Sequence, residues 1–290
     1  MKNILLIGII LSVLFPVGAI SADRKMYFGI SGQPFLGYYQ NKKFHKMKQY
    51  EINDLDKNGP LGRFLDQFKR RGPFRGFHAD GTPIAVTIDT ITMPSGGVGD
   101  PPIFRYKLKS QKLRRKGDIF YFTPNRNVRY ITTESKAVDK KAYKMMRREI
   151  IATVEKLREP RSNNSRFTKL LSYAIKEPKI SGPRGESDVV AAYWPIDIKA
   201  IGKVDVKPFT RRGGAFFIYS RHAQRIVYSL YDILSSSSGF MSESLLPILY
   251  FTIEGDGTVY MLAAYSDNWE GGEYRIINFK NGKILLYAFD

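Results

Sequence analysis

A series of apolar runs near the C-terminus, separated by turn-forming residues, most constrains how this chain can fold. The four runs are Pro247–Glu254, Thr258–Tyr265, Glu273–Lys280 and Lys283–Phe289. Gly255-Asp256-Gly257 separates the first two runs, and Asn281-Gly282 separates the last two. An Asn-Gly pair between apolar runs favours a type I′ hairpin, because both central positions of that turn need φ > 0. The sequence therefore predicts that the chain ends in a four-strand antiparallel meander.

Segments closer to the N-terminus carry the patterns of further strands and of four helices. The expected strands are Lys25–Ile30, Phe35–Gln40, Ile84–Met93, Ile103–Lys109, Asp118–Thr123, Val128–Thr132, Asp188–Trp194, Ile196–Val206 and Ala215–Ser220. The expected helices are Pro60–Arg71, Asp139–Glu159, Ser165–Glu177 and His222–Leu234. The predicted fold class is α+β, with antiparallel sheets and a few packed helices.

The first 22 residues have the pattern of a secretory signal peptide. Lys2 precedes an unbroken apolar run from Ile4 to Ile20, and cleavage could follow Ser21 or Ala22. The alternative is an uncleaved anchor, because a run of this length is at the short limit for a membrane-spanning helix. Both interpretations place the rest of the chain outside the cytoplasm, either in the periplasm or secreted. No later segment is apolar enough to span a membrane.

The residues available for catalysis are restricted. The chain has no cysteine, which excludes disulfides, thiolate zinc sites and cysteine nucleophiles. It also lacks the common serine-hydrolase, zinc-protease, Walker A and EF-hand motifs. We therefore expect neither a metal nor a cofactor, and whether the protein is an enzyme stays open, with a non-catalytic role favoured.

Positive charge divides the chain into two parts. Residues 23–182 contain 34 Lys and Arg against 15 Asp and Glu, whereas residues 183–290 contain 11 against 12. Such an asymmetry indicates two units with different partners. We expect a basic α+β domain at 23–182 and a near-neutral β-rich domain at 183–290 packed on it, joined near Ile180–Gly185.

The stretch from Ile103 to Tyr130 is the most basic part of the chain. Alternation puts three of its cations on one face of the expected strand, and more follow in the next turn, loop and strand. The candidate anion-binding residues are Arg105, Lys107, Lys109, Lys112, Arg114, Arg115, Lys116, Arg126 and Arg129. The candidate aromatic contacts are Tyr106, Tyr121 and Tyr130. If the strands of this stretch pair as neighbours in a meander, these side chains meet on one surface that attracts polyanions.

The favoured function is electrostatic docking on an anionic envelope component or polymer, such as lipopolysaccharide or other envelope lipid head groups, an acidic glycan or nucleic acid. The C-terminal part could contact a protein partner. One alternative is a secreted hydrolase or lyase of an anionic polymer, in which His78 is the base and Arg71 or Arg75 neutralises charge. A second alternative is a subunit of an envelope, secretion or pilus assembly.

Overall fold

The computed structural model describes residues 25–30, 37–46, 69–92, 105–109, 119–156, 169, 171–197, 213–232, 244–267 and 271–287. The predicted signal peptide lies outside these residues, and so does most of the expected helix Pro60–Arg71. Of the expected helix Ser165–Glu177, residues 169 and 171–177 are described. Residues 169 and 171–174 are helical, whereas 175–177 are not, and Ile175 forms a β-bridge with Ile196.

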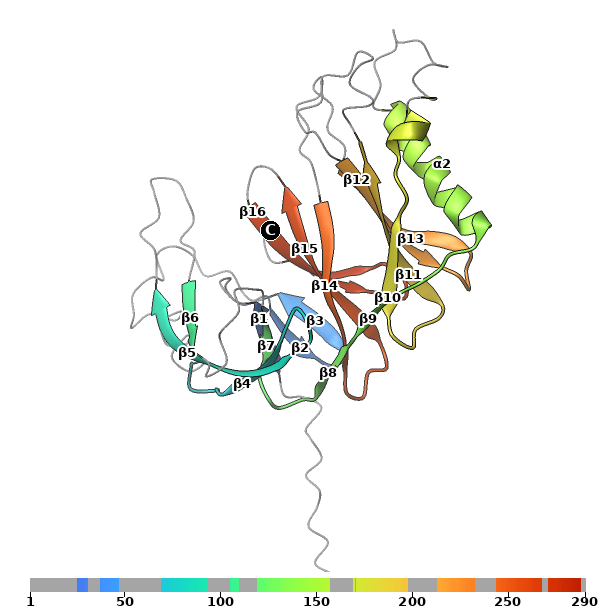
Figure 1. The fold of residues 1–290 in the computed structure, drawn as a ribbon. Coiled ribbons are helices and arrows are strands. Elements are labelled where there is room, and N and C mark those ends of the chain that lie inside the picture. Colours follow the sequence, from blue (N-terminus) through green and yellow to red (C-terminus); the bar gives the residue numbers. More distant parts are fainter. Residues whose placement is uncertain are drawn as a thin grey trace, which may run out of the picture.

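The described strands form three antiparallel sheets. The N-terminal sheet has the order β3-β2-β1-β7-β4-β5-β6, the middle sheet β17-β16-β15-β14-β8, and the helix-covered sheet β13-β12-β11-β10-β9 (Figure 1). The strands of the N-terminal sheet are β1 Met26–Ile30, β2 Gly37–Gln40, β3 Lys43–Lys46, β4 Phe74–His78, β5 Pro83–Thr92, β6 Arg105–Lys109 and β7 Ile119–Phe122. Those of the middle sheet are β8 Val128–Ile131, β14 Ser244–Ile253, β15 Val259–Asp267, β16 Gly271–Asn278 and β17 Ile284–Tyr287. Those of the helix-covered sheet are β9 Thr133–Ser135, β10 Lys179–Pro183, β11 Val189–Ile196, β12 Gly213–Ser220 and β13 Arg225–Asp232.

Helix α2, Lys140–Lys156, packs on the helix-covered sheet. Asp139 caps its start, because the Asp139 Oδ1 accepts a hydrogen bond from the Ala142 amide at 2.7 Å. Every fourth residue of the helix from Ala142 to Val154 is buried, and this stripe contacts Trp194 and Phe217. The expected helix Asp139–Glu159 is therefore confirmed, and its apolar stripe is core.

The middle sheet is covered on both faces. One face, with Tyr250 and Met261, packs against the helix-covered sheet, and the other, with Phe251 and Leu262, packs against the N-terminal sheet. Successive residues of a strand point to opposite faces, so a strand buried on both sides needs apolar residues at nearly every position. The layers therefore follow one another as α2, helix-covered sheet, middle sheet and N-terminal sheet.

The C-terminal strands β14 to β17 each pair antiparallel with the next one in the chain. The turn between β16 and β17 differs from the expected type I′ turn, because Gly282 has φ 71° while Asn281 is not among the residues with positive φ. Both φ angles are positive instead in the two-residue turn Asn41-Lys42, which joins β2 to β3.

The expected helix His222–Leu234 is wrong. After a turn at residues 221–224, the chain forms strand β13, which pairs along its length with β12. A bulge in this pairing puts Ile226 toward α2, whereas Tyr228 and Leu230 face the middle sheet. A bulge interrupts strict alternation, and the apolar spacing that results resembles that of a helix.

The expected meander of the three strands between residues 103 and 132 is also wrong. Strand β6 pairs with β5, β7 lies between β1 and β4, and β8 joins the middle sheet beside β14. Although the three strands are close in sequence, β6 pairs with the strand directly before it, whereas β7 and β8 pair with strands distant in sequence.

The boundary expected between residues 182 and 183 falls inside β10, which pairs with β9 on one side and β11 on the other. Strands from both sides of this boundary share the helix-covered sheet and the middle sheet. The division by charge is therefore not a division between sheets.

Asp256 ties the N-terminal sheet to the middle sheet. Its Oδ2 accepts hydrogen bonds from the hydroxyl groups of Tyr39 on β2 and Tyr260 on β15, and both tyrosines are buried. Burial alone would raise the pKa of the Asp256 carboxyl, but bonds from Tyr260, Tyr39 and Thr258 and the charge of Lys42 lower it below its ordinary value. The same cluster raises the pKa of both tyrosines, mainly through burial and the bonds to Asp256.

We expect Asp256→Ala to lower the free energy of unfolding by about 3 kcal/mol, because two buried hydroxyl groups lose a charged acceptor. Asp256→Asn keeps an acceptor oxygen and should cost less. Urea unfolding measures both. Glu254→Ala, an exposed change in the same turn, is the matched control and should stay within about 0.5 kcal/mol of wild type.

The stabilisation from Asp256 should also depend on acid. Because its folded pKa lies below the ordinary value of 3.8, the unfolded chain takes up the proton first, and the contribution is lost as pH falls through the folded pKa. The difference in unfolding free energy between wild type and Asp256→Asn should be constant from about pH 5 to pH 8 and shrink below about pH 4. A difference that stays constant in acid would contradict a lowered pKa.

Candidate functional site

Most of the predicted anion-binding side chains lie outside the part of the chain whose side chains the structure describes. Lys112, Arg114, Arg115 and Lys116 lie outside the described residues. Arg105, Lys107 and Lys109, together with Tyr106, belong to β6, whose backbone alone is described, at the edge of the N-terminal sheet. Because β6 pairs with neither β7 nor β8, strand pairing does not bring these cations beside Arg126 and Arg129.

The other predicted site residues lie on different elements. Arg126 stacks over the ring of Tyr39, with its guanidinium carbon 5.5 Å from the ring centroid, while Arg129 is exposed on β8. Tyr121 is fully buried against Phe74, so its ring cannot contact a ligand at the surface. Tyr130 is half-buried and packs on Phe77, and burial raises the pKa of its hydroxyl.

The candidate catalytic residues do not converge. His78 is buried at the end of β4, and alternation places Arg75 on the opposite face of that strand. Arg71 lies near the other end of β4 and stacks over Tyr27, 4.7 Å from its ring centroid. Four residues of strand, about 13 Å, separate Phe74 from His78. The described geometry thus brings neither Arg71 nor Arg75 to the side of His78.

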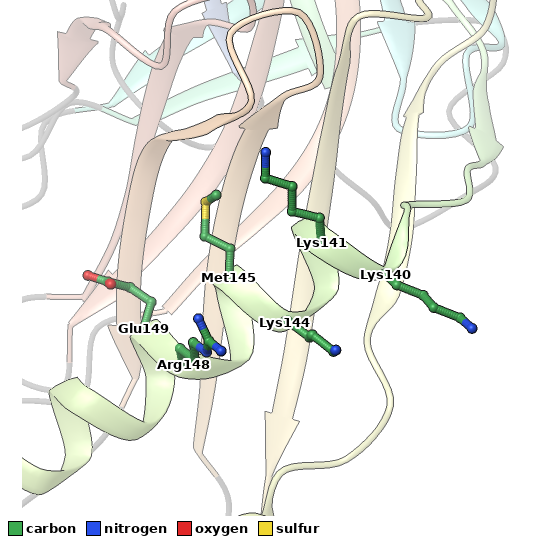
Figure 2. Close-up of a pocket in the computed structure, with 6 residues that line it drawn as sticks. All are labelled: Lys140, Lys141, Lys144, Met145, Arg148 and Glu149. Atoms are coloured by element: carbon green, nitrogen blue, oxygen red, sulfur yellow. The ribbon is translucent and has the colours of Figure 1, made fainter.

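A basic surface that the sequence analysis did not single out lies on the outer side of α2. We call it the α2 basic face, and it consists of Lys140, Lys141, Lys144 and Arg148, all exposed. Lys144 and Arg148 extend from one side of the helix, and Lys141 and Met145 from another (Figure 2). These residues and Glu149 line a groove of about 640 Å³. Among the described residues, no carboxylate oxygen lies within 4.0 Å of the four cations.

The placement of these cations opposes the stability of the helix. The N-terminal end of a helix carries a partial positive charge and favours acidic side chains. The first turn of α2 contains none, and instead holds Lys140 and Lys141. Lys141 donates a hydrogen bond to Gln224 at 2.6 Å, but Lys140 and Lys144 have no such bond to a described residue. The face concentrates positive charge where the helix itself disfavours it.

A second surface combines cations with aromatic rings on the outer side of β1, β2 and β3. Tyr27, Tyr38 and His45 are direct cross-strand neighbours, with ring centroids 5.8 Å apart for the first pair and 4.8 Å for the second. Lys25 lies over Tyr38 at 4.3 Å, and Arg71 covers Tyr27. We call these five residues the ring ladder. They face away from the middle sheet, because the alternate residues of these strands fill the core.

Hydrogen bonds fix the backbone beside the ring ladder. The Thr123 hydroxyl accepts from the Tyr27 amide at 3.0 Å and donates to the Asn125 side chain at 2.8 Å. Asn125 in turn donates to the carbonyl of Lys25 at 3.0 Å. Lys25, Tyr27 and Arg71 line a pocket of about 550 Å³ with Thr123, Pro124 and Asn125. Lys25 and Arg71 are thus held beside an open pocket.

The two surfaces differ in how far the sequence predicts them. Lys140, Lys144 and Arg148 recur every fourth residue in a segment correctly predicted as helical, so they share one face. The ring ladder depends on the turn Asn41-Lys42, which sets the register of Tyr38 and His45. That turn lacks the glycine typical of two-residue hairpin turns, so local pattern does not predict it.

Comparison of the chain with known protein families, curated proteins and solved structures found no match. The parts of the chain that the structure describes contain no group of three or more His, Asp or Glu side chains placed to hold a metal ion. None of the described helical segments has the length and apolar character of a membrane-spanning helix.

Lys140→Glu should raise the free energy of unfolding by about 0.5 kcal/mol, because an acidic side chain suits the first turn of a helix and can pair with Lys144. Lys156→Glu is the matched control in the last turn, where the same change should destabilise the protein. Urea unfolding of both variants measures the difference. Shifts of the same sign for the two would show that Lys140 does not oppose the helix dipole.

Proposed function

We propose that this protein is exported and docks electrostatically on an anionic envelope component or polymer. The α2 basic face is the described surface that best supports this role. The cations from Arg105 to Arg129 are a second, separate part of the proposed binding surface, predicted from their charge, because β6 lies at the edge of the N-terminal sheet and α2 packs on the helix-covered sheet. The single observation that carries the proposal is the exposed, uncompensated row of cations at the N-terminal half of α2.

The physical basis is the cost of keeping such a row. Like charges on successive turns repel one another, and cations in the first turn oppose the helix dipole. A polyanion removes both costs when it binds, and each cation near an anionic surface contributes about 1 kcal/mol. The face spans nine residues of helix, about 12 Å from the first to the last, so it can contact several phosphate, sulfate or carboxylate groups at once.

The α2 basic face is suited to binding by long-range electrostatic attraction and not by enclosure of the ligand in a cavity. The groove on α2 is lined by residues of one helix, so it offers charge and little enclosure. Ligands held mainly by charge release counterions when they bind, and their affinity therefore falls steeply with salt. We expect this salt dependence to be the main property of the complex.

The test measures binding of a chain that begins at Asp23 to lipopolysaccharide, to an acidic glycan and to duplex DNA across a salt series. The double variant Lys144→Gln/Arg148→Gln should weaken binding. On duplex DNA it should reduce the slope of log affinity against log salt by about 2, because two phosphate contacts are lost. Arg114→Ser/Arg115→Ser/Lys116→Ser tests the second part of the proposed surface in the same way.

The matched control is Lys280→Gln/Lys283→Gln, which removes two exposed cations from the hairpin between β16 and β17. It should leave the slope within about 0.5 of wild type, since these positions lie outside the proposed surface. An equal loss for the control and the α2 variant would mean that net charge alone, and not the α2 basic face, drives binding. Absence of binding to all three ligands would refute the proposed function.

A further inference from the structure

We infer that the protein bridges two anionic lipid surfaces, because it carries two basic faces, each with a tyrosine in it or near it, on opposite outer layers of the fold. This inference rests on the proposed function. It adds a second binding face, the ring ladder, and selects one ligand class among those proposed, the phosphate groups of membrane lipids. The α2 basic face would contact one membrane surface and the ring ladder the other.

The order of the layers places the two faces back to back. Helix α2 lies outside the helix-covered sheet, and the ring ladder lies on the outer side of the N-terminal sheet, with the middle sheet between them. Figure 1 shows α2 and strands β1 to β3 on opposite sides of β14 and β15. No single flat surface can touch both faces.

The separation also makes the faces electrostatically independent. Packed layers are about 10 Å apart, so the two faces are separated by roughly 30 Å. Screening in physiological salt reduces interactions over about 8 Å. A ligand on one face therefore neither attracts nor repels a ligand on the other, and both can be occupied at once.

The ring ladder is suited to an anionic ligand by its own composition. Lys25 and Arg71 of the ring ladder are exposed, and so is the neighbouring Lys43. Strands β1, β2 and β3 contain no acidic residue. Lys43 shares its face with His45, because alternate residues of a strand point the same way. The half-buried Tyr38 lies among these cations.

Tyrosine beside cations favours a lipid surface over a soluble polymer. Tyr173 is 69% exposed and lies next to α2, since Arg147 donates a hydrogen bond to the carbonyl of Ser172 at 2.8 Å. In the ring ladder, the half-buried Tyr38 lies beside the cation of Lys25. Tyrosine rings concentrate at the level of lipid head groups, where one end is apolar and the other is wet. Each face therefore pairs phosphate-binding cations with an aromatic side chain suited to the interface.

The test mixes the chain beginning at Asp23 with vesicles of phosphatidylcholine and phosphatidylglycerol, measures clustering by light scattering, and measures binding by sedimentation. Wild type should bind and cluster the vesicles. Lys144→Gln/Arg148→Gln and Lys25→Gln/Arg71→Gln should each still sediment with the vesicles but lose clustering, because each keeps one face. Lys280→Gln/Lys283→Gln should cluster them like wild type, and thermal unfolding checks that all variants fold.

Each other outcome overturns a defined part of the inference. Binding without clustering by wild type, or full clustering by the ring-ladder variant, would show that one face suffices and that bridging is wrong. Binding to duplex DNA or an acidic glycan without binding to vesicles would refute the lipid surface while the proposed docking stands. No binding to vesicles, DNA or glycan would refute docking and bridging together.

Discussion

Burial of the middle sheet on both faces is the constraint on which the rest of the structure depends. A sheet covered on two sides needs a second layer above it and a third below it, and the helix-covered and N-terminal sheets provide them. Apolar burial is the main favourable contribution to folding, and here it is concentrated at the centre of a stack. The outer layers are thereby left to carry charge.

Charge inside this stack is tolerated where it is fully hydrogen-bonded. Asp256 lies at the junction of two sheets, and two tyrosine hydroxyl groups hold its carboxylate. A partly buried carboxylate without such partners would be costly. Burial acts to raise the pKa of Asp256, but the hydrogen bonds from its partners lower it below the ordinary value. The cations of α2 differ, because no described side chain compensates them and they face solvent. Asp256 is therefore a structural charge, whereas the cations of α2 are candidate binding charges.

Much of the secondary structure could be predicted from local pattern. The apolar stripe predicted α2, and turn residues bounded most strands. The prediction failed at β13, where a bulge imitated helical spacing, and between residues 103 and 132, where strands close in sequence joined different partners. For the candidate site, the sequence analysis predicted anion binding at Arg105–Arg129 and did not single out α2 or the ring ladder.

The sequence by itself determined that the chain forms antiparallel strands with few helices, that its excess charge lies before residue 183, and that Lys140, Lys144 and Arg148 share a helix face. These properties depend on neighbours within a few residues. Only the tertiary structure decided which strands share a sheet and which faces remain outside. Backbone hydrogen bonds between strands are nearly the same for any side chains, so burial selects the partners. That selection placed the α2 basic face and the ring ladder on opposite sides of the molecule.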